Sequence, residues 1–402
     1  MGSALDKVTV KSFKSLVEAE VAIARINVFI GANGSGKSNL LEALGVLGAA
    51  AAGRIDDSTL KERGVRPGVV NLYHSSFRNL KRSNFIRLFG AAGDTSYAVC
   101  IRNPSAQGTI TRWRYDTESL ESKGVRVVGR SPRSSEGPNP DVGLVALKLV
   151  EMSPETPAAR FVTALQGFRI YSPVTHFLRY SNDPTQQDPI GLLGGGLEVA
   201  VDEMLADLRR RLGEGGFTSF ASALYKLIGW ADQIKAIGRD QAPLPPSIAS
   251  GPKVLLFRDR FMARGRDTLT AHDASEGALY VLFGLVVALH PRSPSVAAID
   301  NFDQALNPRL AKAFTRFLCE WSRRLQPERQ LLLTCHNPLV LDGLPLADDA
   351  SIRLFAVDRD NTGRTIIRYR DLGSLVAAKK DNPAPLSRLW VMGALGAIPS
   401  DV

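Results

Sequence analysis

Apolar runs separated by polar turns predict alternating strands and helices at both ends of this sequence. Residues 28–30 form an apolar run typical of a buried strand, and a Gly-rich turn separates them from a helix with apolar positions at helical spacing. The later part predicts an apolar helix over 276–290, a strand over 297–300, a helix from 307, a buried strand over 331–334, and then a β-hairpin with a short final helix.

The middle of the chain has a different pattern. Residues 84–130 hold β-rich, partly alternating segments separated by Gly, Asp, Pro and Ser, which predict an antiparallel β-meander. After a short strand at 168–173, two helices are predicted at about 197–212 and 217–229. The apolar run 253–257 follows a Pro-rich linker and is expected to return the chain to the central sheet.

The composition is that of an ordinary globular protein, with 44% apolar and 22% charged residues. The net charge of +10 favours contact with nucleic acid or an acidic partner. No apolar stretch reaches the length of a membrane span, and the first residues lack a secretory signal pattern, so no membrane partner is expected. Three widely spaced cysteines fit neither a disulfide framework nor a zinc cluster, which favours a cytoplasmic location.

The Gly-rich turn carries the strongest chemical signal. Gly31 to Ser38 matches G-x-x-x-x-G-K-[ST] in full, in the strand–turn–helix context that this motif requires. Glycines let backbone N–H groups surround phosphate oxygens, and the helix N-terminus adds partial positive charge. We expect ATP here, with Lys37 reaching the β- and γ-phosphates and Ser38 ligating Mg²⁺. The predicted nucleotide cradle comprises Gly31, Asn33, Gly34, Gly36, Lys37, Ser38 and Asn39.

A carboxylate ends the apolar run 297–300. Asp300 is placed as in magnesium–nucleotide sites, so Asp300 and Ser38 are the predicted metal ligands. Many ATPases have a glutamate next, which handles the attacking water, whereas this chain has Asn301. Loss of a general base typically costs about 10²–10⁴ in rate. We therefore expect slow hydrolysis, unless Asp303 or another group supplies the base or the amide orients the water.

Two further motifs flank the acidic strand. Ser275 and Gly277 open the apolar helix before it, where Ser275 is a good N-cap and the helix start can bind an anion. His336 follows the next buried strand, at a position from which a side chain can hydrogen-bond a γ-phosphate. Taken alone, each has an ordinary explanation, either helix capping or a polar loop. Glu276 and His336 are alternatives to Asp303 as the base.

The order of these motifs resembles the ATP-binding-cassette (ABC) superfamily. More narrowly, residues 1–60 and 250–345 resemble the heads of RecF, of the structural-maintenance-of-chromosomes (SMC) proteins and of the overcoming-lysogenisation-defect (OLD) ATPases. The resemblance implies an α/β fold, an ABC-type P-loop ATPase head with a mixed central sheet, an antiparallel β-meander and an inserted helical lobe. The expected parts are an N-terminal ATPase lobe (1–190), a helical insert (191–250) and a C-terminal ATPase lobe (251–402).

The resemblance also implies how the site would work. In that family two heads sandwich two ATP molecules, and each nucleotide on one P-loop is capped by the partner's signature helix. Ser275 and Gly277 would then contact the γ-phosphate in trans, within a homodimer or higher oligomer. Glu276 departs from the glycine usual in this signature, and an acid there must point away from the phosphate or pair with a cation. The expected catalytic set is Asp300, Asn301, Asp303 and His336.

Two differences from relatives narrow the expected function. SMC heads carry long coiled coils where this chain has two short helices, and OLD nucleases append a nuclease domain where residues 337–402 predict only a hairpin and a helix. Asp358 and Asp360 look like a metal pair, but hairpin-turn chemistry explains them better. We expect an ATP-assembled switch that controls a separate effector, such as a nuclease or toxin, in bacterial anti-phage defence. The alternative is a RecF-like DNA-binding ATPase of repair or recombination; the long β-meander disfavours a transporter subunit.

Basic clusters are candidate nucleic-acid contacts. Residues 77–87, 112–114, 209–211 and 258–266 concentrate Lys and Arg, in part with aromatic residues between them. Solvated ion pairs explain any single cluster better, although the total charge favours at least one nucleic-acid face. Lys14 or Phe13 is expected near the adenine, with core packing the better explanation for Phe13.

Overall fold

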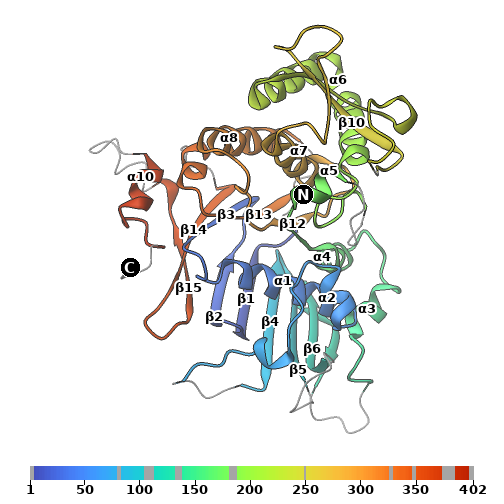
Figure 1. Ribbon diagram of the computed structural model, residues 1–402. Helices are drawn as coiled ribbons and strands as arrows, with labels where there is room; N and C mark the ends of the chain where they lie inside the picture. Colours follow the sequence, from blue (N-terminus) through green and yellow to red (C-terminus); the bar gives the residue numbers. More distant parts are fainter. Residues whose placement is uncertain are drawn as a thin grey trace.

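The computed structural model describes residues 4–78, 83–103, 113–131, 138–180, 188–248, 250–325, 329–345, 350–373 and 385–397. Parts of the basic clusters at 77–87 and 112–114, and the start of the meander segment that leads into 114, lie outside these ranges. Helices cover and separate three sheets (Figure 1). This mixed α/β architecture confirms the predicted fold class.

The central sheet combines strands from both ends of the chain. Its order is β15-β14-β3-β13-β12-β8, and every neighbouring pair is parallel except β14 and β15. The strands are β3 (Ile26–Ile30), β8 (Arg169–Tyr171), β12 (Val296–Ile299), β13 (Gln330–Cys335), β14 (Ile352–Arg359) and β15 (Thr365–Arg370). The residues of β3, β12 and β13 are all buried, as expected for parallel strands covered on both faces.

A second sheet contains the predicted meander. Its order is β2-β1-β4-β5-β6-β7, antiparallel throughout. The strands are β1 (Lys7–Phe13), β2 (Leu16–Ala22), β4 (Phe85–Ala92), β5 (Thr95–Arg102), β6 (Arg114–Ser122) and β7 (Val125–Arg130). Helix α1 (Lys37–Ala51) lies against this sheet and is buried along most of its length, so the helix that begins at the P-loop is fixed in the core (Figure 1).

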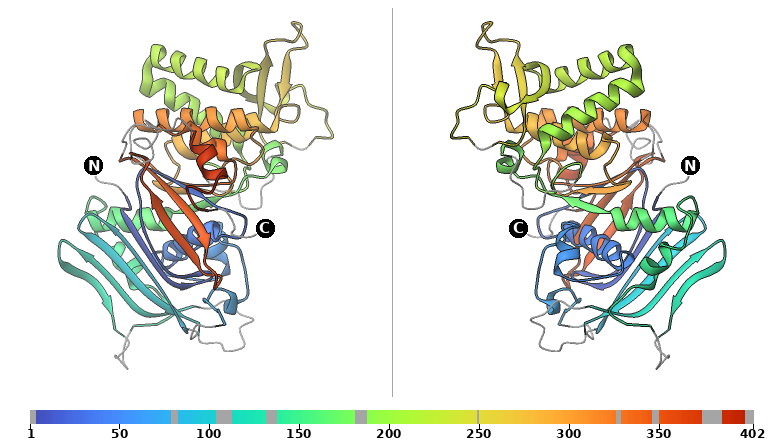
Figure 2. Two further views of the ribbon diagram at one scale, coloured as in Figure 1. Left: turned by 90° about the vertical axis from the view of Figure 1, so that its left-hand side faces the viewer. Right: turned by 90° about the vertical axis from the view of Figure 1, so that its right-hand side faces the viewer.

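Helices α7 (Glu276–Leu289) and α8 (Pro308–Arg324) cover the other face of the central sheet, and the helical lobe lies outside them (Figure 1). Helix α6 (Leu197–Ile228) breaks at Gly213, whose φ of 65° and ψ of 174° are not helical, so the two predicted helices are confirmed. Its halves lie beside α7 and α8 (Figure 2). Helix α7 is apolar on all sides and is buried from Ala278 to its end, as a helix of that composition requires.

The run 253–257 does not join the central sheet, contrary to the sequence expectation. It forms β10 (Lys253–Asp259), which pairs with β9 (Ala231–Gly238) and β11 (Thr268–Thr270) in a separate three-stranded sheet. An apolar run indicates a buried strand but does not specify its sheet, and antiparallel neighbours in sequence tend to pair locally.

The remaining helices are shorter. They are α2 (Asp57–Lys61), α3 (Leu144–Leu149), α4 (Pro157–Gly167), α5 (Thr175–Arg179), α10 (Leu386–Val391) and the 3₁₀ turns η1 (Val70–Leu72), η2 (Arg239–Gln241) and η3 (Pro338–Gly343). No helix in the described ranges combines the length and apolarity needed to cross a membrane.

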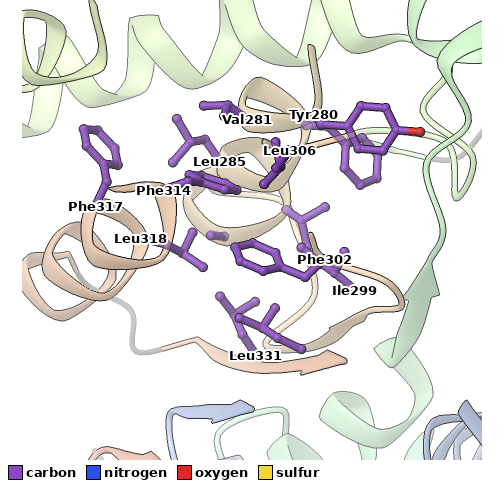
Figure 3. Packing of buried hydrophobic residues seen from close by; sticks show 14 of the residues in the cluster. Tyr280, Val281, Leu285, Ile299, Phe302, Leu306, Phe314, Phe317, Leu318 and Leu331 are labelled. Carbon is purple, nitrogen blue, oxygen red and sulfur yellow. The ribbon is translucent and has the colours of Figure 1, made fainter. Parts of the chain in front are cut away.

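Core packing fixes the segment that follows Asp300. The ring of Phe302 stacks on that of Phe314 from α8, with centroids 5.0 Å apart, among Ile299, Leu285 and neighbouring side chains (Figure 3). Phe302 is only 4% exposed, and its packing holds the neighbouring polar residues Asn301 and Asp303 at the sheet edge.

Candidate nucleotide site

The P-loop follows β3 and has a backbone that requires glycine. Gly34 and Gly36 have φ of 77° and 107°, in the left-handed region that other residues enter at a cost. A Cβ on Gly36 would lie 2.0 Å from Thr365 Oγ1, and one on Gly31 would lie 2.2 Å from the carbonyl oxygen of Val357. Glycine at these positions therefore allows both the backbone turn and the close approach of Thr365 and Val357.

Lys37 folds back across this loop. Its ammonium donates to the carbonyl oxygens of Gly31 at 2.7 Å and Ala32 at 3.0 Å. Burial lowers the pKa of Lys37 from its ordinary value of 10.5 to about 8, although Asp300 and Asp303 lie near enough to oppose that shift. A phosphate in the loop would supply the negative charge that a buried ammonium lacks.

Ser38 and Asp300 meet at the carboxyl edge of the central sheet. The Ser38 hydroxyl donates to Asp300 Oδ2 at 2.8 Å, across 262 positions of sequence. A hydroxyl and a single carboxylate are hard oxygen ligands of the kind that hold Mg²⁺ when nucleotide phosphates and water complete its shell. The two predicted metal ligands are therefore adjacent and chemically suited to that ion.

Asn301 occupies a left-handed backbone position. Its φ is 56°, a conformation that asparagine tolerates better than most residues. Its backbone N–H donates to Thr334 Oγ1 at 2.8 Å, and Thr334 in turn donates to Asp300. The left-handed backbone thus explains why asparagine suits position 301, and its amide leaves the site without the usual glutamate.

Asp303 holds the loop that carries His336. Its Oδ2 accepts the backbone N–H groups of His336, at 2.8 Å, and Asn337. Asp303 as a residue is 9% exposed, so this contact is largely protected from solvent. Partial burial and the Lys37 ammonium lower the pKa of His336, which favours the neutral ring. The geometry thus gives Asp303 an anchoring contact that sequence reasoning did not anticipate.

The signature residues begin α7, and across the residues that the structure describes no hydrogen bond joins the Ser275 side chain to the P-loop of the same chain. Ser275 occupies the N-cap position and is exposed, yet among the described residues no α7 backbone N–H donates to its side chain. The predicted N-cap position of Ser275 is therefore confirmed, but its hydroxyl makes no capping bond within the described ranges and accepts from Trp230 Nε1 at 3.2 Å instead. Gly277 packs against α8, where a Cβ would lie 2.9 Å from Leu310 Cδ2.

The C-terminal hairpin braces the P-loop, which sequence reasoning missed. Thr365 Oγ1 donates to the carbonyl oxygen of Ser35 at 2.7 Å, and Arg359 Nε donates to that of Gly34 at 2.7 Å. Asn39 Nδ2 donates to Ser15 Oγ at 2.6 Å in the same corner. These partners are far apart in sequence, so no local pattern could have indicated them.

A cavity of about 520 Å³ opens beside the P-loop. It is lined by Lys14, Ser15, Asn39, Arg66, Pro67, Gly68, Asn71, Leu72, Tyr73, His74, Ser76, Phe77 and Arg359. Beneath it, Glu42 of α1 is 2% exposed and pairs with Lys14 and with Arg66, whose Nε lies 2.5 Å from Glu42 Oε1. Phe13 is fully buried, which confirms the core-packing interpretation for that ring.

The hairpin acids and two basic clusters have local explanations. Asp360 Oδ1 accepts the N–H groups of Thr362 and Arg364, which confirms the turn interpretation, and Asp358 pairs with Arg368. Within the described ranges, no group of three or more His, Cys, Asp or Glu is arranged to hold a metal. In the basic clusters, Arg210 and Arg211 pair with Asp207, and Arg258 pairs with Asp232.

Comparisons with known proteins agree with this arrangement. Residues 4–85 match the family model "AAA ATPase domain", and residues 218–342 match "AAA domain, putative AbiEii toxin, Type IV TA system". The chain is 30% identical over 107 residues to the DNA replication and repair protein RecF of Magnetococcus marinus; this match spans 26% of the chain and 28% of that protein.

Solved structures show the same fold. The Smc head bound to the C-terminal winged-helix domain of ScpA is 16% identical, with a TM-score of 0.51 over 93% of this chain and 99% of that one. A second Smc head, from Pyrococcus furiosus and bound to the C-terminal domain of ScpA, is 14% identical, with a TM-score of 0.52 over 96% of this chain and 100% of that one. The ordered motifs, their meeting at one sheet edge and these matches show the fold of an ABC-type P-loop ATPase head, similar to the RecF and SMC proteins.

Proposed function

We propose that this chain is an ATP-driven switch whose heads associate when they bind ATP and Mg²⁺ and separate after slow hydrolysis. The observation that carries the proposal is the contact of Ser38 with Asp300 at 2.8 Å, directly after the loop that holds Lys37. It supports a preformed site for a magnesium–nucleotide complex, because the cation ligands meet without rearrangement of the fold.

Each part of a magnesium–nucleotide site has a candidate residue in this chain. Lys37 and the P-loop amides would bind the β- and γ-phosphates, and Ser38 and Asp300 would hold the ion. When bound, Mg²⁺ would neutralise charge on the transferred phosphoryl group. The cavity lined by Lys14 and Tyr73 is adjacent to Asn39 and suits the nucleoside.

Asn301 supports slow turnover. An amide can orient a water molecule but cannot remove its proton, so chemistry at this site would lack the usual general base. The Asp303 carboxylate already accepts two backbone N–H groups, which supports an anchoring role over a proton-accepting one. A switch that hydrolyses slowly remains assembled until another event releases it.

The exposed start of α7 supports association of two heads. Ser275 and Glu276 are exposed, and within the described part of the chain no hydrogen bond joins Ser275 to the P-loop residues. A two-fold arrangement would let each head supply its P-loop to one nucleotide and its Ser275 and Gly277 to the other.

The biological setting remains a proposal with two versions. In the first, the switch controls a separate nuclease or toxin in anti-phage defence. The match to a family model whose description names a toxin and a type IV TA system supports this version. In the second, the head binds DNA in repair or recombination, which the match to a RecF protein supports. Tight binding to gapped DNA that occurs only with ATP favours the second version, and its absence favours the first.

The central proposal is tested with Lys37→Ala, using Lys148→Ala as the matched control, because Lys148 is an α3 side chain paired only with its neighbour Glu151 in the described structure. Wild type and Lys148→Ala are expected to bind ATP and to sediment as larger species with ATP and Mg²⁺. Lys37→Ala loses a charge-assisted contact worth about 1.5–3 kcal/mol, roughly 10- to 100-fold in affinity. ATP binding by Lys37→Ala at wild-type affinity would refute the site assignment.

A further inference from the structure

Trp230 and Ser275 contact each other at the exposed start of α7. The indole Nε1 of Trp230 donates to the hydroxyl of Ser275 at 3.2 Å, although the two residues are 45 positions apart. Trp230 directly follows Gly229, which ends α6 with a φ of 87°, and precedes β9. The contact therefore joins the helical lobe to the first residue of the signature.

The three-stranded sheet fixes Trp230 in this position. Its ring lies against Phe257 of β10, with centroids 5.4 Å apart and planes tilted by 40°. The backbone N–H of Arg260 donates to the Trp230 carbonyl oxygen at 3.0 Å, and the Arg260 guanidinium donates to the carbonyl of Gly229. A half-buried indole held by the contact with the Phe257 ring and by its own backbone has little freedom to turn its N–H away.

The chemistry of the pair sets the direction of the Ser275 hydroxyl. An indole N–H can only donate, so Ser275 Oγ must use a lone pair to accept it. At an N-cap, serine ordinarily uses that oxygen to accept from its own helix, and here α7 makes no such bond within the described residues. The hydroxyl proton is left free to donate to another acceptor, at the N-terminal turn of α7 where helix N–H groups lack partners within the helix.

We propose that Trp230 is a positioning residue that holds the Ser275 hydroxyl as a donor toward the γ-phosphate bound on the partner head. A phosphate offers only acceptor oxygens, so a serine fixed as a donor matches it, whereas a freely rotating serine must be ordered on binding. This inference rests on the proposed function, in which Ser275 caps a nucleotide in trans. The inference assigns Trp230, which lies outside the signature, a part in the contact between Ser275 and the nucleotide on the partner head.

The test uses Trp230→Phe, which keeps an aromatic ring against Phe257 and removes the N–H. Its affinity for ATP on its own P-loop is expected to equal that of wild type, while ATP-dependent association weakens about tenfold, the upper range for one neutral hydrogen bond. In steady-state kinetics the loss is expected in kcat at saturating protein and ATP, with KM for ATP unchanged. Trp230→His restores a ring N–H and is expected to recover part of the association.

Coupling to Ser275 separates positioning from general damage. In a Ser275→Ala background, Trp230→Phe is expected to cause no further loss, because the hydroxyl that it orients is gone. An equal loss in both backgrounds would show that Trp230 acts only through stability. Trp390→Phe makes the same chemical change on α10 and is expected to behave as wild type.

Two measurements distinguish failure of this inference from failure of the proposed function. If wild-type protein does not associate when it binds ATP, the proposed function is contradicted, and the role of Trp230 that depends on it is contradicted as well. If wild type associates and Trp230→Phe associates equally well, only the role of Trp230 is overturned. Without nucleotide, the indole N–H resonance of Trp230, assigned by its loss in Trp230→Phe, is expected to shift in Ser275→Ala; an unchanged resonance also overturns the inference.

Discussion

The hydroxyl of Thr334 donates to Asp300 Oδ1 at 2.6 Å, so a fully buried residue of β13 orients the carboxylate that directly follows β12. The same hydroxyl accepts the Asn301 N–H at 2.8 Å. One side chain thereby fixes the predicted metal ligand and the backbone of the residue that replaces the usual glutamate. Sequence motifs name Asp300 and Asn301, but only the parallel pairing of β12 with β13 brings Thr334 between them.

Thr334→Val is expected to weaken both the fold and the metal site. Valine has the same shape but leaves the Asn301 N–H without this partner. This loss is expected to lower the free energy of unfolding by about 1–3 kcal/mol. Loss of a group that orients a metal ligand typically lowers metal affinity or activity by about 10- to 100-fold. Chemical denaturation and the Mg²⁺ dependence of ATP turnover measure the two effects. Thr334→Ser keeps the hydroxyl as the control, and Mg²⁺ dependence unchanged in Thr334→Val would contradict the role.

Asn301→Glu is expected to speed ATP turnover and to destabilise the protein. A carboxylate restores a general base, an effect of about 10²–10⁴ in rate where its geometry is right. The left-handed backbone at φ 56° favours asparagine, so glutamate there costs about 1–2 kcal/mol in the free energy of unfolding. Phosphate release and thermal unfolding are the measurements. Asn301→Gln has the same length without a base, so faster turnover in both variants would argue against general-base loss.

Asp303→Asn distinguishes an anchor from a base. An amide oxygen can still accept the N–H groups of His336 and Asn337, so most of the turnover and stability is expected to remain. Asp303→Ala leaves both N–H groups without that partner and is expected to lose about 1–3 kcal/mol for each group that stays buried. A loss of turnover in Asp303→Asn as large as in Asp303→Ala would make Asp303 the missing base.

The lowered pKa of Lys37 predicts how ATP affinity depends on pH. Burial places that pKa at about 8 in the folded protein, against an ordinary value of 10.5. Between these values the unfolded chain binds more protons, so the contribution of Lys37 to the free energy of unfolding rises with pH. Below pH 8 the cost of burying the ammonium is fully present.

ATP favours the ammonium, so binding above pH 8 is expected to take up a proton and to weaken by up to about tenfold per pH unit. Calorimetry at pH 7 and pH 9, in two buffers of different ionisation enthalpy, measures this uptake. Lys37→Arg stays protonated and is expected to show no such uptake. Equal heats in both buffers at pH 9 for the wild-type protein would exclude the linkage.

Local sequence determined the nucleotide-binding elements of this protein. Glycines at 31, 34 and 36 favour a turn that other residues form only at a cost, and the apolar runs around them predict a buried strand and helix. Spacing in the later part likewise predicted the strands that end at Asp300 and before His336. These features follow from neighbours along the chain, which is why they could be predicted from one sequence.

Tertiary structure decided which of these residues cooperate. Thr334 donates to Asp300, and Thr365 and Arg359 donate to carbonyl oxygens of the P-loop. Trp230 donates to the Ser275 hydroxyl, which capping rules would pair with the backbone of α7. The run 253–257 was correctly predicted as a strand and assigned to the wrong sheet. Such pairings depend on how strands and helices are packed, and hydrophobic periodicity carries information about burial but none about the partner.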